Sequence, residues 1–218
     1  MNLLAFDTST TACSIAIQKG DEVRLSHQIA PMQQARLILP VIQDLLNSVA
    51  LTVNDLDAIV YGCGPGSFTG IRIASSVAQG IAFALNKPVV QISSLAAIAQ
   101  SGLRDQHLNR MLVAVDARMD EIYWAAYEAN KQGYVELQGQ EQVSKPEDVT
   151  LPAGDDWYGV GDGWLKYQDD LASRLGFRPH AIYPAVLPTA EDLLQLARIK
   201  LAQGEWVAAA DAVPVYLR

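Results

Sequence analysis

The segment that could most directly do chemistry is a glycine-rich turn between a predicted strand at 58–61 and a predicted helix at about 69–86. Glycines there allow positive φ angles and close approach of the backbone to a ligand. The N-terminus of the following helix offers unpaired N–H groups and the positive end of the helix dipole, which together favour an anion. The turn is not a Walker A loop, because no Gly-Lys-Ser/Thr stands at the required place. A structural turn that lets the helix pack closely on its sheet accounts for the same glycines equally well.

A second polar turn follows the first predicted strand, at Phe6-Asp7-Thr8-Ser9-Thr10. A carboxylate and hydroxyl groups in such a turn can face a nucleotide phosphate and its metal ion. The same groups can instead satisfy the backbone of the turn itself. The two turns together provide the candidate anion- or nucleotide-binding residues, which are Asp7, Thr8, Ser9, Gly64, Gly66, Ser67, Thr69 and Gly70.

Histidine and cysteine residues show no spacing typical of catalysis or metal binding. His27, His107 and His180 lie far apart and form no HxxxH or HExxH pair, so no predicted helix presents two imidazoles to a metal. Cys13 and Cys63 form no CxxC pair, and no histidine lies near Cys63 in the sequence. A GxSxG nucleophile elbow is also absent. We therefore predict no metal site, no catalytic residue and no enzymatic activity for this chain alone.

The charge and hydropathy of the chain argue against several functions. It has 218 residues and a net charge of -8, and its 16 lysines and arginines are scattered. Strong independent binding of nucleic acid usually needs a basic patch, so we do not expect it here. The N-terminus has no basic, apolar leader. The apolar run 71–85 is interrupted by polar residues and falls short of the ~20 apolar residues of a membrane span. These features predict a soluble cytoplasmic protein without a membrane segment.

The elements that must position the two turns are predicted as two similar halves. A strand ending in Asp116 repeats the first unit 109 residues after Asp7, half of the 218-residue length. The helix near the C-terminus begins with a capping box, Thr189-x-x-Asp192. The predicted strands are 3–10, 13–17, 23–29, 58–61, 89–92, 112–116 and 122–127, and the predicted helices are 33–50, 69–86, 94–100 and 190–203.

Strands that lead into hairpins and then helices, twice over, predict an α/β fold. We expect the two-lobed actin/Hsp70/sugar-kinase-like (ASKHA) type, with duplicated lobes of mixed sheets flanked by helices. We assign residues 1–105 to the N-terminal lobe and residues 106–218 to the C-terminal lobe.

The first two predicted helices have unusual surfaces. The helix at 33–50 is apolar over a wide arc and contains Pro40, so we expect it to bend there or to begin later. The helix at 69–86 carries many small residues, which allow another helix to approach closely. Side by side, the two helices could bury one face in their own lobe and offer the other to a partner. Burial of both helices on all sides is the alternative.

Several segments resemble the TsaB (YeaZ) family across almost the whole chain. They are Ile38-Leu39-Pro40, Gly64-Pro-Gly-Ser-Phe-Thr-Gly-Ile-Arg72, Asp116-Ala117-Arg118-Met119, Glu121-Ile122-Tyr123, Val160-Gly161-x-Gly163-Trp164 and Pro214-Val-Tyr-Leu-Arg218. The resemblance implies a non-catalytic subunit that binds and activates TsaD, a related enzyme. TsaD-type enzymes form N6-threonylcarbamoyladenosine next to the anticodon of tRNA.

The resemblance also implies the partners. A TsaD-type paralogue binds through the two helices, a TsaE-type ATPase joins the complex, and the chain alone forms a homodimer. No cofactor is expected for this chain, because ATP and metal belong to the partner subunits. A bulky charged residue at Ser75 or Ala82 should then prevent pairing and leave the fold intact. The implied partner-binding residues are Leu37, Ile38, Val41, Leu45, Ile71, Ser75, Val77, Ala78 and Ala82.

Two positions depart from the family pattern. Gln34 stands where many relatives carry a histidine, and the sequence stops at Arg218, where some relatives continue with a polar tail. A role tied to that histidine or tail is therefore not expected here. The alternative function is an independent ATP-binding small-molecule kinase or ATPase of the same fold, which would use Asp7 and the turn from Gly64 to Gly70.

Overall fold

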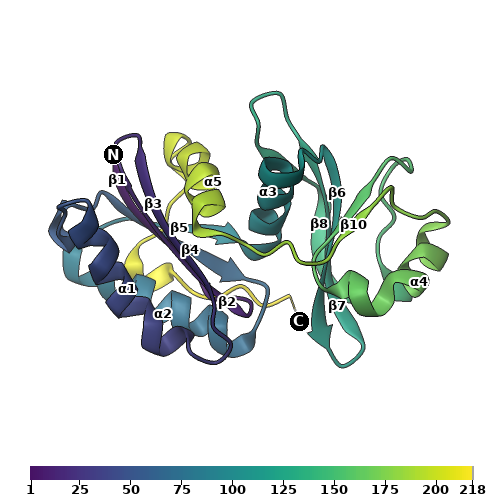
Figure 1. The fold of residues 1–218 in the computed structure, drawn as a ribbon, viewed down its shortest axis with the longest axis horizontal. Helices are drawn as coiled ribbons and strands as arrows, with labels where there is room; N and C mark the ends of the chain where they lie inside the picture. Colours follow the sequence, from purple (N-terminus) through teal and green to yellow (C-terminus); the bar gives the residue numbers. More distant parts are fainter. Residues whose placement is uncertain (218) are drawn as a thin grey trace. The chain divides into compact units, whose positions relative to one another are not determined.

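The fold is described by a computed structural model of residues 1–217 (Figure 1). The chain forms two compact units. Unit 1 comprises Met1–Ala97 and Pro188–Val215, and unit 2 comprises Ile98–Leu187 with the residues from Tyr216 on. Arg218, part of the family-like C-terminal segment, lies outside the described residues.

Unit 1 is built on a five-stranded mixed sheet in the order β3-β2-β1-β4-β5. The first three strands form an antiparallel meander, and β4 and β5 continue the sheet in parallel with β1. The strands are β1 (Asn2–Asp7), β2 (Ala12–Lys19), β3 (Glu22–Ile29), β4 (Ala58–Gly64) and β5 (Val89–Ser93).

Unit 2 repeats this sheet strand for strand. Its order is β10-β9-β6-β7-β8, again a meander whose first strand pairs in parallel with the fourth. The strands are β6 (Arg110–Arg118), β7 (Glu121–Ala129), β8 (Val135–Ser144), β9 (Tyr158–Val160) and β10 (Ile182–Tyr183). The shared topology confirms the predicted duplicated fold of mixed sheets flanked by helices.

Helices cover both faces of each sheet. In unit 1, α1 and α2 lie side by side on one face and α5 lies on the other (Figure 1). In unit 2, α4 packs against one face of the sheet through Trp164, whose ring lies against Gly159. α3 packs against the other face beside Met111. The helices are α1 (Gln34–Ser48), α2 (Phe68–Leu85), α3 (Ser94–Gln106), α4 (Gly163–Leu175) and α5 (Ala190–Ala202), with short 3-10 turns η1 (Val53–Asp55), η2 (Pro146–Asp148) and η3 (Ala209–Asp211).

The predicted lobe boundary needs correction at two places. α5 and the segment after it belong to unit 1 instead of the C-terminal lobe, and α3 is assigned to unit 2 from Ile98 on. α5 is held on the first sheet by Ala190 N–H, which donates to Ser14 Oγ at 2.8 Å, and by Lys200 Nζ, which donates to Gln91 O at 3.0 Å. The predicted cap is present, since Thr189 Oγ1 accepts from Asp192 N–H.

Judged by length and composition alone, one helix within residues 1–217 is long and apolar enough to cross a membrane, and this helix is α2. In unit 1 it instead packs along β4, with Gly70, Ile71, Ala74, Ser75, Ala78 and Ala82 buried. These small side chains let α2 lie close to the sheet. α2 is therefore a core helix of unit 1 with one exposed face.

Candidate functional site

The polar turn after β1 is closed by its own hydrogen bonds. Asp7 is 1% exposed, and its Oδ1 accepts from Ser9 N–H at 2.8 Å and from Ser9 Oγ at 2.7 Å. Ser94 Oγ donates to the other oxygen, Oδ2, at 3.3 Å. Both carboxylate oxygens are thus occupied inside unit 1. Gly62 is required beside them, because a Cβ atom there would lie 1.8 Å from Asp7 Oδ2.

The glycine-rich turn packs directly against this first turn. Thr8 Oγ1 donates to Gly70 O at 2.7 Å, and Ser67 N–H donates to Ser9 O at 2.7 Å. A Cβ atom at Gly70 would lie 1.9 Å from Thr8 O, and one at Gly66 would lie 2.5 Å from Ser9 O. These glycines serve the close approach of two backbone segments.

The rear of the glycine turn is covered by the C-terminal segment. Val215 N–H donates to Cys63 O at 2.8 Å, and a Cβ atom at Gly64 would lie 2.9 Å from Val215 O. At the start of α2, Ser67 Oγ accepts from Gly70 N–H at 3.3 Å. The structure therefore brings the predicted anion-binding residues together, but it uses most of their polar groups internally and favours the structural interpretation of both turns.

Burial raises the pKa of Asp7 above its ordinary value of 3.8, although the hydrogen bonds from Ser9 and Ser94 oppose the shift. The unfolded chain therefore releases this proton at lower pH than the folded protein. Between the two pKa values the folded state binds more protons, so the contribution of Asp7 to stability falls as pH rises. Above the raised pKa, Asp7 is ionised in both states, and the burial of its charge lowers the free energy of unfolding by a constant amount.

We predict that Asp7→Asn removes this pH dependence. Asparagine can keep the two acceptor bonds from Ser9 and donate to Ser94 Oγ, so the turn should retain its shape. Relative to the unmodified protein, the free energy of unfolding of the variant should rise from about pH 4 upward and then level off, with a slope of at most ~1.4 kcal/mol per pH unit. Urea unfolding from pH 3.5 to 8 measures the difference. Parallel pH curves would contradict the burial of a titrating Asp7.

No cluster of three or more His, Cys, Asp or Glu side chains that could hold a metal occurs within residues 1–217. Both cysteines, Cys13 and Cys63, are buried thiols. Burial raises the pKa of Cys13 to about 11, so its reactive thiolate form is scarce at neutral pH.

The predicted partner surface on α1 and α2 needs correction. Five of its nine residues face the core, with 0–3% of their surface exposed: Ile38, Ile71, Ser75, Ala78 and Ala82. Ser75 Oγ donates to Ala212 O at 2.6 Å, which ties α2 to the C-terminal segment. The other four, Leu37, Val41, Leu45 and Val77, are half-buried. Helical spacing identified the apolar face correctly, but that face is largely the one that binds the first sheet.

The exposed face of the helix pair consists of other residues. Leu39 on α1 is 56% exposed, and Phe83 near the end of α2 is 81% exposed. Beside Phe83 lies a groove of about 450 Å³, lined by Ser76, Gln79, Gly80 and Phe83 of α2 and by Ala209 and Ala210 of η3. Sequence patterns do not predict this groove, because α2 and η3 lie far apart in the chain and meet only in the folded protein.

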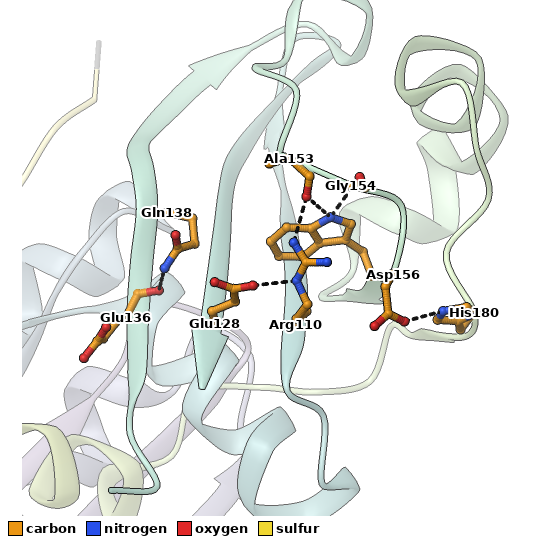
Figure 2. A network of polar contacts seen from close by, with 9 residues as sticks. Arg110, Glu128, Glu136, Gln138, Ala153, Gly154, Asp156 and His180 are labelled. Atoms are coloured by element: carbon orange, nitrogen blue, oxygen red, sulfur yellow. Dashed lines mark hydrogen bonds and ion pairs between the residues drawn. The ribbon is translucent and has the colours of Figure 1, made fainter. Parts of the chain in front are cut away.

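A second polar network, in unit 2, anchors the loop after η2 to the sheet (Figure 2). Arg110 Nε lies 2.6 Å from Glu128 Oε1, and Arg110 Nη2 donates to Ala153 O at 2.7 Å. The guanidinium lies 4.1 Å above the centre of the Trp157 ring, a cation–π contact. His180 Nε2 lies 2.6 Å from Asp156 Oδ1 at the end of the same loop. These contacts hold a loop that the sequence left without structure.

Comparison with known proteins identifies relatives of this fold and site. The family model described as "TsaD: tRNA N6-adenosine threonylcarbamoyltransferase" matches residues 27–162. The tRNA threonylcarbamoyladenosine biosynthesis protein TsaB of Escherichia coli K12 is 39% identical and aligns with 100% of this chain and 95% of its own length. TsaB of Haemophilus influenzae is 34% identical, with 100% and 94% covered.

A solved structure agrees with these relatives. YeaZ from Pseudomonas aeruginosa superimposes with a TM-score of 0.93 at 45% identity, and the match covers 99% of both chains. The likeness of sequence and fold extends over both units. The chain therefore belongs to the TsaB (YeaZ) family.

Proposed function

We propose that this chain is a non-catalytic subunit in the formation of threonylcarbamoyladenosine in tRNA, which binds and activates a TsaD-type enzyme. Membership of the TsaB family carries this proposal, since relatives that match the whole chain are named for this biosynthesis. The closed turns support it as well, because the Asp7 carboxylate accepts hydrogen bonds from Ser9 and Ser94, and Ser67 N–H of the glycine turn donates to Ser9 O.

The surface that fits this role is the exposed face of α1 and α2. Large apolar side chains such as Leu39 and Phe83 remain exposed there, although each could have been replaced by a polar residue without harm to the core. Phe83 also borders the groove formed with η3, and a large exposed apolar side chain beside a groove is typical of protein–protein contacts. The TsaD family model matches a range that contains both helices, so a TsaD-type partner has counterparts of them.

The remaining features of the proposal follow from the family. The chain works in the cytoplasm, forms a homodimer when alone, and meets a TsaE-type ATPase only in the assembled complex. ATP and metal reside in the partner subunits. The net charge of -8 disfavours strong direct binding of tRNA by this chain, so tRNA binding falls mainly to the partners.

Light scattering on a sizing column tests the proposal, with this chain alone and mixed with TsaD from the same source. We expect a one-to-one complex that forms at the expense of any homodimer. Threonylcarbamoyladenosine formation should require both proteins together with TsaE, ATP and the threonylcarbamoyl donor. Absence of a complex, with or without TsaE and ATP, would reject the proposal. Binding of millimolar ATP by this chain alone in calorimetry would instead favour the kinase or ATPase alternative.

A further inference from the structure

The two sheets have four edge strands, and three of them are closed to a further strand. β5 in unit 1 is bridged by Val207, which exchanges two backbone hydrogen bonds of 2.9 Å with Val89. In unit 2, β10 has only two residues, and β8 is mostly polar and leaves its regular pairing with β7 at a bulge. Short strands, bulges and covered edges are the usual devices that prevent a sheet from pairing with another chain.

Within residues 1–217, β3 is the one edge strand that has none of these devices, and no strand lies on its outer side. Its eight residues pair with β2 without a register shift, from Ala12 opposite Ile29 to Lys19 opposite Glu22. The strand contains no proline, glycine or lysine. Leu25 is 41% exposed and Ile29 is 62% exposed. A long, regular edge with exposed apolar side chains is a template for a further strand.

The apolar residues of this edge share one face of the sheet. Ser14 lies opposite His27, and its Oγ accepts the hydrogen bond from the first N–H of α5, so both side chains point to the α5 side. Side chains alternate along a strand, which places Leu25 and Ile29 on the same side as His27. A strand added to this edge therefore covers both apolar side chains at once.

The charges of β3 lie on its other face and cancel each other. Arg24 Nη2 lies 2.5 Å from Glu22 Oε1. With His27 neutral, the strand has no net charge, although the whole chain has a net charge of -8. A second copy of this acidic chain consequently meets less repulsion at β3 than elsewhere on the surface.

The sequence of β3 is also complementary to itself in an antiparallel pair. With a two-fold axis at Ser26, no like charges lie opposite each other. The opposite pairs in this register are Val23 with Ile29, Arg24 with Gln28, and Leu25 with His27. An axis at Arg24 would place two guanidinium groups face to face, and an axis at Leu25 would place Ile29 outside the strand pair. The axis at Ser26 is therefore the favoured register.

We infer that two copies of this chain join through β3, antiparallel about an axis at Ser26, so that their two five-stranded sheets become continuous. A second copy fits this edge better than an unrelated strand, because the edge supplies its own apolar and neutral counterparts. The contact is isologous and closes on itself. Its residues belong to neither α1 nor α2, so the inference goes beyond the proposed function and does not depend on it.

Leu25→Lys tests the contact, because a lysine on an edge strand disfavours pairing with another strand. We expect the unmodified chain to self-associate at roughly 0.1 mM in sedimentation equilibrium. The mass of the largest species should fall by half in the variant. Leu137→Lys is the matched control, since Leu137 lies on the edge strand β8 and is 42% exposed, and it should leave the mass unchanged. Thermal unfolding verifies that both variants are folded, and Ile29→Lys replaces Leu25→Lys if the latter does not fold.

Cysteine cross-linking tests the register. Two copies of Ser26→Cys would meet at the axis, whereas two copies of Gln28→Cys would lie four residues apart along the pair, roughly 14 Å, which a disulfide does not span. With an added oxidant, Ser26→Cys should form a disulfide-linked dimer and Gln28→Cys should not. The native Cys13 and Cys63 are buried, so the unmodified chain serves as the blank.

Three outcomes would overturn the inference. The first is an unchanged mass for the folded Leu25→Lys variant together with no cross-link at position 26. The second is a Leu25→Lys variant that keeps its mass but no longer binds TsaD, because the edge would then receive a strand of that partner. The third is equal cross-linking of Ser26→Cys and Gln28→Cys, which indicates random collision instead of a defined strand pair.

Discussion

Gly70→Ala is expected to destabilise the protein by about 3 kcal/mol, a large fraction of the stability of a domain of this size. The new Cβ atom would lie 1.9 Å from Thr8 O, a backbone atom that cannot move aside as a flexible side chain can. The turn that carries Thr8 must therefore shift. This shift would strain the hydrogen bond from Thr8 Oγ1 to Gly70 O and the neighbouring bond from Ser67 N–H to Ser9 O.

Gly80→Ala on the same helix is the control for Gly70→Ala. It meets nothing within 4 Å, so it should stabilise the protein by roughly 0.5–1 kcal/mol through helix propensity alone. Urea unfolding followed by tryptophan fluorescence and circular dichroism gives both free energies. Equal effects of the two substitutions would show that the two turns do not pack as closely as described.

The duplicated architecture was predictable because the chain repeats a local pattern at half its length. An apolar strand that ends in an aspartate and a polar turn occurs at Asp7 and again at Asp116, and each marks the first strand of a sheet. Such a pattern is set by neighbouring residues, so it is visible without the fold. The sequence patterns did not predict β8, α4 or the two short strands of unit 2. For β8 the reason is that a polar, exposed strand lacks the alternation of a half-buried strand.

The assignment of α5 to unit 1 could not be predicted in the same way. Its apolar residues and its Thr189 cap predict a helix, but they do not say which sheet the helix will cover. That choice depends on contacts between residues far apart in the chain, such as Ala190 N–H with Ser14 Oγ. The half-length repeat placed the boundary where the repeat begins, and the chain instead returns to unit 1 after β10.

The candidate site shows a similar division between what the sequence decides and what it leaves open. Glycines next to a strand and a helix suit a phosphate loop and a tightly packed turn equally well, because both need a backbone without side chains. Only the fold reveals that the atoms opposite Gly66 and Gly70 are backbone oxygens of Ser9 and Thr8. Likewise, a helical pattern shows which residues of α2 share a face, but it does not show whether a sheet or a partner covers that face.

Two neighbouring positions on α2 decide between the partner surface predicted from the sequence and the exposed face of the helix. Ala82 is fully buried in unit 1, whereas Phe83 is 81% exposed. Ala82→Glu would place a charge without a counter-charge in the apolar core, which should cost at least about 3 kcal/mol and unfold much of the protein. The sequence-based expectation that such a charge spares the fold is therefore reversed.

Phe83→Glu should behave in the opposite way. An exposed side chain on a helix changes the free energy of unfolding by no more than about 0.5 kcal/mol, so this variant should fold normally. Its complex with TsaD should weaken by at least about tenfold, because an exposed aromatic residue beside a groove is typical of a binding hot spot. Urea unfolding and calorimetric titration with TsaD measure the two effects. A folded Ala82→Glu variant that fails to bind TsaD, together with a Phe83→Glu variant that binds normally, would restore the original surface and move the partner away from the groove.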